Sequence, residues 1–176
     1  LQGLCGILPV RENIIRPLLG MTRKDVEAYC KHENLDFVTD STNLSADYAR
    51  NRVRLEVLPV LETLNPSVVD AFSRMTESVR QDVDFLADYA FEKYKELKTD
   101  GAISVSRLLM LPKCVQARVL KQAFCDFGGK DLSAFHLEQL LSVCRNGGRT
   151  VLPGKIIARR RADRLEFLKD FPKPAP

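Results

Sequence analysis

Apolar residues recur at helical spacing through most of this chain, whereas alternating runs are short and lie mostly near its end. The clearest pattern follows Asn65-Pro66, an N-cap residue with proline at the first helical position. From there to about Lys98 one side of the expected helix is apolar, and Thr99-Asp100-Gly101 closes it. The apolar positions are Val68, Val69, Phe72, Met75, Val79, Val83, Leu86, Ala90 and Tyr94. Their spacing predicts one long amphipathic helix.

Shorter helices are predicted on both sides of the long one. Thr22 and Asp25 form a variant capping box, which places a helix over residues 23–33. A second helix is predicted over residues 50–58, and proline should stop it near Pro59. Two more are predicted beyond the long helix, each followed by a glycine pair, over residues 111–127 and 133–144.

Strand signals are few and short. Residues 40–47 are rich in side chains that hydrogen-bond their own backbone, which predicts an ordered loop. Short runs of apolar and β-branched residues predict strands at 35–38, 103–105, 149–152, 155–160 and 165–168. The expected fold class is therefore mainly α, with a small β-hairpin element near the C-terminal end.

Composition narrows the class of protein. The chain is 45% hydrophobic and 28% charged, as in soluble globular proteins. No apolar run approaches the ~20 residues of a membrane span, and no secretory leader is visible, so we expect a cytoplasmic protein with no membrane partner. The chain starts without Met inside an apparently structured segment, which suggests truncation. Five cysteines without CxxC spacing and only two histidines predict reduced thiols and no metal site.

Positive charge is concentrated at one end of the chain. The net charge is +4, yet residues 1–64 hold 8 basic and 9 acidic side chains, and residues 65–146 hold 11 of each. Residues 147–176 hold 8 basic and 3 acidic side chains. The excess predicts an anionic partner near the C-terminal end.

The richest local constellation joins a polar loop to an arginine-rich helix. Arg50 and Arg54 are four positions apart, which places both on one helix face, with Asn51 beside them. Near a helix N-terminus these donors suit a phosphate or carboxylate, and Asp40 and Asn43 could orient them. The alternative is that Asp40 pairs with one arginine and only fastens the loop to the helix. Arg16 and the nearby Arg11 are further anion-binding candidates, or else solvated or structural arginines.

A second set of basic residues lies in the later helices and strands. It comprises Lys113, Arg118, Lys121, Arg145, Arg149, Arg159, Arg160, Arg161 and Arg164. Such residues suit RNA phosphates, which give salt-dependent affinity without sequence recognition. The alternative is ordinary solvated surface charge. Without Trp or an aromatic-studded sheet, base stacking is not indicated.

An ordered set of segments in the first 66 residues resembles the tRNA-isoleucine lysidine synthetase family. The segments are Gly3–Ile7, Ile15–Leu19, Asp40–Asn43, Arg50–Arg54 and Leu58-Pro59. The remainder, to about Lys169, resembles the family's middle substrate-binding domain through weaker patterns such as Leu152-Pro153-Gly154.

The resemblance implies a ligase whose catalytic half is an α/β domain of the PP-loop type. That family adenylates the wobble cytidine of isoleucine tRNA with ATP and Mg²⁺, and the ε-amine of lysine then displaces AMP. The Ser-Gly-Gly-x-Asp-Ser loop that cradles pyrophosphate in the family does not occur in these 176 residues, so no turnover is expected from them alone.

The resemblance also implies roles for the candidate residues and limits for the domains. Arg50, Asn51 and Arg54 would face the active-site cleft as catalytic residues, near lysine or the target nucleotide. Asp40, Asn43 and Arg16 would bind substrate or shape the cleft. Residues 1–64 would end the α/β domain, residues 65–170 would form the helical tRNA-binding domain, and residues 171–176 a tail.

Two other functions remain open at this stage. One is a non-catalytic RNA- or DNA-binding helical module in which Arg50 and Arg54 contact phosphate only. The other is a protein-interaction domain that offers the apolar side of the long helix to a partner. Self-association into a homodimer is also left open.

Overall fold

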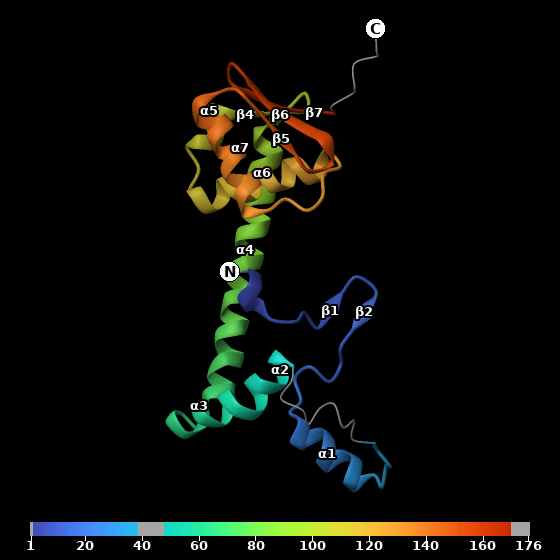
Figure 1. Ribbon diagram of the computed structural model, residues 1–176. Helices are drawn as coiled ribbons and strands as arrows, with labels where there is room; N and C mark the ends of the chain where they lie inside the picture. Colours follow the sequence, from blue (N-terminus) through green and yellow to red (C-terminus); the bar gives the residue numbers. More distant parts are fainter. Residues whose placement is uncertain (1, 39–47, 170–176) are drawn as a thin grey trace. The chain divides into compact units, whose positions relative to one another are not determined.

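The computed structural model describes residues 2–38 and 48–169, and the chain divides into two compact units, Leu1–Gln81 and Asp82–Pro176 (Figure 1). The division falls inside α4 (Val68–Leu97), the long helix predicted from the apolar periodicity. The helix begins after a turn in which the Asn65 side chain accepts a hydrogen bond from the Ser67 amide, at 3.0 Å. The predicted helix is confirmed, with its start two residues beyond Pro66.

The first unit is built from short elements that precede or begin α4. They are a 3-10 helix (Gln2–Cys5), β1 (Val10–Arg11), β2 (Ile14–Ile15), α1 (Arg23–His32), α2 (Ala49–Arg52), a π-helical turn (Val53–Val57) and α3 (Leu58–Leu64). The capping box of α1 is present: the Asp25 amide donates to the Thr22 hydroxyl, and the Asp25 carboxylate accepts from the Thr22 amide. The Thr22 hydroxyl and, after it, the Thr22 amide donate to the Asp25 carboxylate and hold its pKa below the ordinary value.

The prediction that the second helix stops near Pro59 is wrong. Helical backbone continues from α2 through the π-helical turn into α3, with Pro59 at the start of α3. The Leu58 amide reaches back five residues to the Val53 carbonyl, so the turn before the proline is wider than an α-helical turn. A proline ring in a regular α-helix clashes with the carbonyl four residues earlier, and the wider turn relieves that clash.

The strand predicted over residues 35–38 is not formed. The segment is irregular and exposed, with Val38 97% accessible. A strand needs a neighbour for its backbone groups, and β1 and β2 pair only with each other within the described part of this unit. The predicted loop over residues 40–47, with Asp40 and Asn43, lies outside the described residues.

The second unit packs helices against a five-stranded antiparallel sheet with strand order β3-β4-β7-β6-β5. Its elements after α4 are β3 (Lys98–Thr99), β4 (Ala102–Ser104), α5 (Val105–Leu109), α6 (Lys113–Asp126), α7 (Ala134–Asn146), β5 (Arg149–Leu152), a 3-10 turn (Pro153–Lys155), β6 (Ile156–Arg161) and β7 (Arg164–Lys169). The predicted hairpin is present as β6 and β7, inside a larger sheet. No sequence pattern predicted β3. Asp100 and Gly101, both at positive φ, join it to β4 in a tight hairpin turn.

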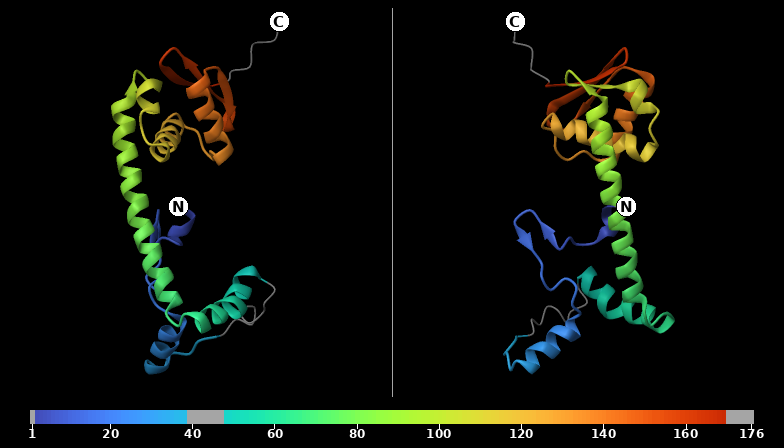
Figure 2. Two further views of the ribbon diagram at one scale, coloured as in Figure 1. Left: turned by 90° about the vertical axis from the view of Figure 1, so that its left-hand side faces the viewer. Right: turned by 180° about the vertical axis from the view of Figure 1, so that it is seen from behind.

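The core of the second unit lies between the sheet and its helices, which gather on one face of the sheet in Figure 2. Phe124, Leu108 and Leu140 are completely buried there. The buried Gln116 amide donates to the carbonyls of Leu109 and Leu111, at 3.2 and 2.7 Å. It thereby satisfies backbone groups where α5 turns into α6.

Asp163, in the turn between β6 and β7, holds the start of α5. Its carboxylate accepts from the Ser106 amide at 2.6 Å and from the Ser104 hydroxyl at 2.8 Å. Its backbone carbonyl accepts from the Val105 amide at 2.8 Å. The donors to the carboxylate, the Ser104 hydroxyl first and then the Ser106 amide, lower the pKa of Asp163 from its ordinary 3.8.

Asp163→Asn should therefore make the unfolding free energy of this unit depend less on pH in the acid range. The folded state holds the carboxylate at a lower pKa than the unfolded chain, so its stabilisation is complete above pH 3.8 and is lost as the pH falls through the lowered pKa. Urea denaturation should show a gap in unfolding free energy between wild type and variant at neutral pH that shrinks below pH 3.8. Asp131→Asn, on an exposed loop, is the control; a gap that stays constant with pH would contradict the capping role.

Candidate functional site

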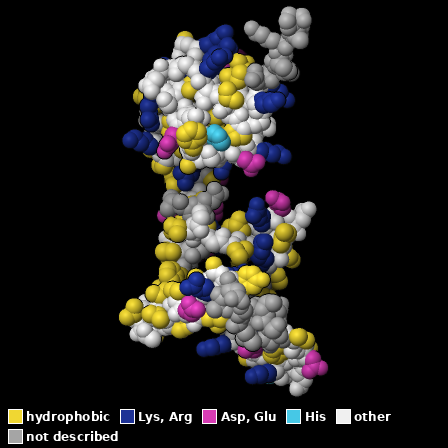
Figure 3. Space-filling view, in the orientation of Figure 1, with side chains coloured by type: hydrophobic (Ala, Val, Ile, Leu, Met, Phe, Trp, Pro, Cys, Tyr) yellow, Lys and Arg dark blue, Asp and Glu magenta, His cyan; other side chains and the backbone are white. Residues whose placement is uncertain are grey.

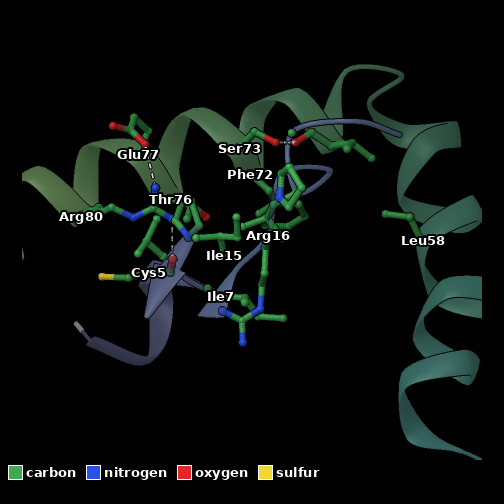
Figure 4. Close-up of a pocket in the computed structure, with 17 residues that line it drawn as sticks. Cys5, Ile7, Ile15, Arg16, Leu58, Phe72, Ser73, Thr76, Glu77 and Arg80 are labelled. Atoms are coloured by element: carbon green, nitrogen blue, oxygen red, sulfur yellow. Dashed lines mark hydrogen bonds and ion pairs between the residues drawn. The ribbon is translucent and has the colours of Figure 1, made fainter. Parts of the chain in front are cut away.

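A cavity of about 760 Å³ lies within the first unit, between the N-terminal segment, the β1–β2 hairpin and the first turns of α4 (Figure 4). Cavities of this size accept small-molecule ligands. The wall is mostly apolar, through side chains such as Ile7, Ile15, Leu58 and Phe72. Its charged lining residues are Arg16, Glu77 and Arg80.

Arg80 fastens the N-terminal segment to α4. Its guanidinium donates to the Cys5 carbonyl at 3.1 Å and pairs with Glu77 at 3.1 Å, as the dashed lines in Figure 4 show. The Nε atom of Arg80 is buried without a hydrogen-bond partner, and the Cys5 side chain is buried beside it. No sequence pattern indicated Arg80, because a lone arginine on an amphipathic helix carries no local signal.

Arg16 lines the cavity and also forms hydrogen bonds that close the β1–β2 hairpin. Its amide donates to the Pro9 carbonyl at 2.8 Å, and its guanidinium donates to the Leu8 carbonyl at 3.1 Å. In Figure 4 the guanidinium lies beside Ile7. One of its five N–H groups is therefore used in closing the hairpin, which leaves donors for an anionic ligand.

Arg50, Asn51 and Arg54 lie in the continuous helical run formed by α2 and the π-helical turn. Arg50 and Arg54 are exposed and Asn51 is half-buried. Arg52, between them, pairs with Glu56 at 3.6 Å. Arg50, Asn51 and Arg54 do not line the cavity. The described structure therefore does not place them in one pocket with Arg16.

The basic residues of the second unit lie on two helices and on the sheet. Lys113, Arg118 and Lys121 lie on α6, where the Arg118 guanidinium donates to the Cys114 carbonyl of its own helix at 2.9 Å. Arg145 ends α7 and is exposed. The remaining arginines lie on the sheet, namely Arg149 on β5, Arg159, Arg160 and Arg161 on β6, and Arg164 on β7.

The Arg160 guanidinium donates to three backbone carbonyls, two of them on a neighbouring helix. It donates to the Cys144 carbonyl, to the Arg145 carbonyl at 3.3 Å and to the Ala162 carbonyl at 2.9 Å. The first two carbonyls belong to the last turn of α7, where a cation also complements the helix dipole. Arg160 thus fixes β6 to α7.

Two family models match the chain in succession. Residues 1–61 match a PP-loop domain, and residues 103–166 match the TilS substrate binding domain. Three relatives are each called tRNA(Ile)-lysidine synthase. The one from Clostridioides difficile is 31% identical over 94% of this chain, that from Bacillus subtilis 33% over 83%, and that from Geobacillus kaustophilus 32% over 96%.

This chain belongs to the tRNA(Ile)-lysidine synthase family. The resemblance found in the sequence is thereby confirmed, as is the fold class: helical segments of a PP-loop domain followed by a mainly helical substrate-binding domain with antiparallel strands. The chain spans 38%, 34% and 39% of the lengths of the three relatives.

In this member of the tRNA(Ile)-lysidine synthase family the two candidate sets fall in different matched segments. Arg16, Arg50, Asn51 and Arg54 lie in the segment that matches the PP-loop domain. Lys113, Arg118, Lys121, Arg145, Arg149, Arg159, Arg160 and Arg161 lie in the segment that matches the substrate binding domain.

One polar cluster of this family member has no signal in the sequence. Asp126, at the end of α6, accepts from the Tyr94 hydroxyl at 2.5 Å and pairs with Lys98, beside a cavity of about 110 Å³. The hydrogen bond from Lys98 lowers the pKa of Asp126, the hydrogen bond to Asp126 raises the pKa of Lys98, and burial raises the pKa of Tyr94. Asp126 stands about thirty positions from its partners, so spacing could not reveal a cluster that ties α4 and β3 to α6.

Within residues 2–38 and 48–169, no three His, Cys, Asp or Glu side chains are grouped so that they could hold a metal ion. Over those residues no helix has both the length and the apolar composition needed to cross a membrane.

Proposed function

We propose that this chain acts as part of a tRNA(Ile)-lysidine synthase, which ligates lysine to the wobble cytidine of isoleucine tRNA with ATP. The observation that carries the proposal is the succession of the two matched segments in one chain, PP-loop domain then substrate binding domain. ATP would form the adenylated cytidine together with Mg²⁺, and lysine would then displace AMP. The protein is expected to work in the cytoplasm.

On this proposal, Arg50, Asn51 and Arg54 lie nearest the reacting groups. Two exposed guanidinium groups on one helix face can stabilise phosphate charge as it develops during adenylation. Asp40 and Asn43 would shape the adjoining loop, and Arg16 would bind substrate with the donors that the Leu8 carbonyl leaves unused.

The second unit would bind tRNA rather than react with it. The proposed contacts are Lys113, Arg118, Lys121, Arg145, Arg149, Arg159 and Arg161, with Arg160 holding the sheet in place. Domain limits at residues 64 and 170, and a homodimer, stay predictions.

The apolar surface of the first unit also supports its place in a larger enzyme. Large hydrophobic side chains are exposed there, among them Ile15 at 72%, Val38 at 97% and Leu64 at 79%. Apolar surface of this extent is ordinarily covered by other protein. In a lysidine synthase, that cover would be further parts of the catalytic domain.

A chimera tests the proposal directly. In the Bacillus subtilis relative, the matching segment would be replaced by this chain, and transfer of labelled lysine to isoleucine tRNA would be measured with ATP. We expect the chimera to form lysidine, whereas this chain alone and the relative lacking the segment should form none. An inactive chimera, together with no preference of this chain for isoleucine tRNA over other tRNAs, would favour an interaction module instead.

A further inference from the structure

One face of the sheet in the second unit carries four arginines in two rows. The pairing register sets Arg149 opposite Arg159 and Arg159 opposite Glu166, and it sets Arg161 opposite Arg164. Directly paired residues of an antiparallel sheet project from the same face, as do residues two apart along a strand. The intervening positions, such as Ala158 and Leu165, are completely buried against the helices, so the arginine face is the outer one.

An apolar row lies beside the arginines on the same outer face. Val151 pairs with Ile157, and Ile157 with Leu168, so the three cross β5, β6 and β7 next to the row of Arg149 and Arg159. Val151 is 61% exposed. Figure 3 shows Lys and Arg side chains beside hydrophobic ones at the end of this unit where Figure 1 places the strands.

Acidic side chains of the same unit neutralise only part of the positive charge on this face. Arg159 pairs with Glu166 at 2.9 Å, and Arg164 reaches the exposed Asp100 at 3.8 Å, an ion pair that solvent screens. Arg149 and Arg161 are exposed and have no ion-pair partner in the described part of the chain. The face therefore keeps a positive excess.

We propose that this outer sheet face binds the sugar-phosphate backbone of RNA, with Arg149, Arg161 and Arg164 as the phosphate contacts. The proposal rests on the proposed function and deepens it, since it selects the sheet over α6 as the main RNA-binding surface. Planar guanidinium groups donate to phosphate in pairs, and the row from Val151 to Leu168 offers apolar support to the sugars. Among the described residues of this face none is aromatic, so it holds RNA without reading its sequence.

Salt dependence of tRNA binding tests the assignment. The dissociation constant of the whole chain for an isoleucine tRNA transcript would be measured over a salt series, for wild type and for the variant Arg149→Ala/Arg161→Ala/Arg164→Ala. Each lost phosphate contact should reduce the slope of log K against log salt by about 0.7–0.9, and the loss of affinity should be the same for other tRNAs. Lys93→Ala/Lys95→Ala/Lys130→Ala removes the same charge elsewhere in the unit and should leave the slope nearly unchanged.

The outcomes separate this inference from the function on which it rests. Wild-type binding of isoleucine tRNA, with the same slope in both triple variants, would overturn the inference and leave the proposed function standing. Absence of tRNA binding by wild type would overturn both. Thermal unfolding at the wild-type temperature confirms that the arginine variant is folded, which is expected because all three replaced side chains are exposed.

Discussion

Alanine in place of Arg50 or Arg54 is expected to lower the rate of lysidine formation by about a hundredfold or more, while tRNA binding changes little. The expectation rests on the proposed function and on the helical run that presents both guanidinium groups on one exposed face. A group that stabilises charge only in the transition state lowers kcat when it is removed, whereas a group that holds the bound tRNA lowers affinity. A large loss of rate with little loss of tRNA affinity would therefore assign Arg50 and Arg54 to transition-state stabilisation.

The same helical run supplies a matched control. Arg52 lies between the two arginines and pairs with Glu56, and Arg52→Ala removes an equal charge from another part of the helix surface. Single-turnover lysidine formation and tRNA dissociation constants would be measured in the chimera with the Bacillus subtilis relative. Equal losses of rate and affinity in the Arg50 and Arg54 variants would place these residues among the tRNA contacts instead.

Gly129→Ala should destabilise the second unit by about 3 kcal/mol, the upper part of the range for overpacked cores. Its amide donates to the Phe124 carbonyl at 2.9 Å and closes the end of α6, after Gly128 at φ 93°. A methyl group on Gly129 would lie 2.3 Å from Cζ of Phe124. That ring is completely buried and packs 6.2 Å from the Phe167 ring, so it has no space into which to move.

A double-mutant cycle isolates this contact. Phe124→Leu removes the ring atoms that the new methyl would meet, so Gly129→Ala should cost much less stability in the Phe124→Leu background than in wild type. Unfolding free energies come from urea denaturation of the four proteins. Gly20→Ala is the control, because a methyl there meets no atom within 4 Å. Additive costs would show that the clash is relieved elsewhere.

Much of the local structure was predictable because it depends on neighbours in the sequence. The Thr22–Asp25 capping box, the long helix after Pro66 and the Ser133 cap of α7 all satisfy or bury groups within a few positions. The helix end predicted near Pro59 was wrong. The π-helical turn before the proline relieves the clash between its ring and the preceding turn, which was the basis for that prediction.

The sequence pointed to candidate site residues, and their roles stay predictions. Residue types and order pointed to Arg50, Asn51 and Arg54 and to the arginines of β6, and the structure describes their surroundings. No sequence pattern indicated Arg80 at the cavity wall or the hydrogen bonds from Arg160 to α7. Both residues act through partners 75 and 16 positions away, and periodicity does not reach that far.

By itself, then, the sequence determined α1, α4, α6 and α7, the caps of α1 and α7, the strands near the C-terminal end and the membership of the family, because these depend on local backbone chemistry and on ordered short segments. Only the tertiary structure decided that β4 pairs with β7, that Asp163 caps α5 and that Asp126 meets Tyr94 and Lys98. It also decided which arginines share the outer sheet face. Those arrangements follow from pairing register and core packing between distant segments, whose free energy no short stretch of sequence contains.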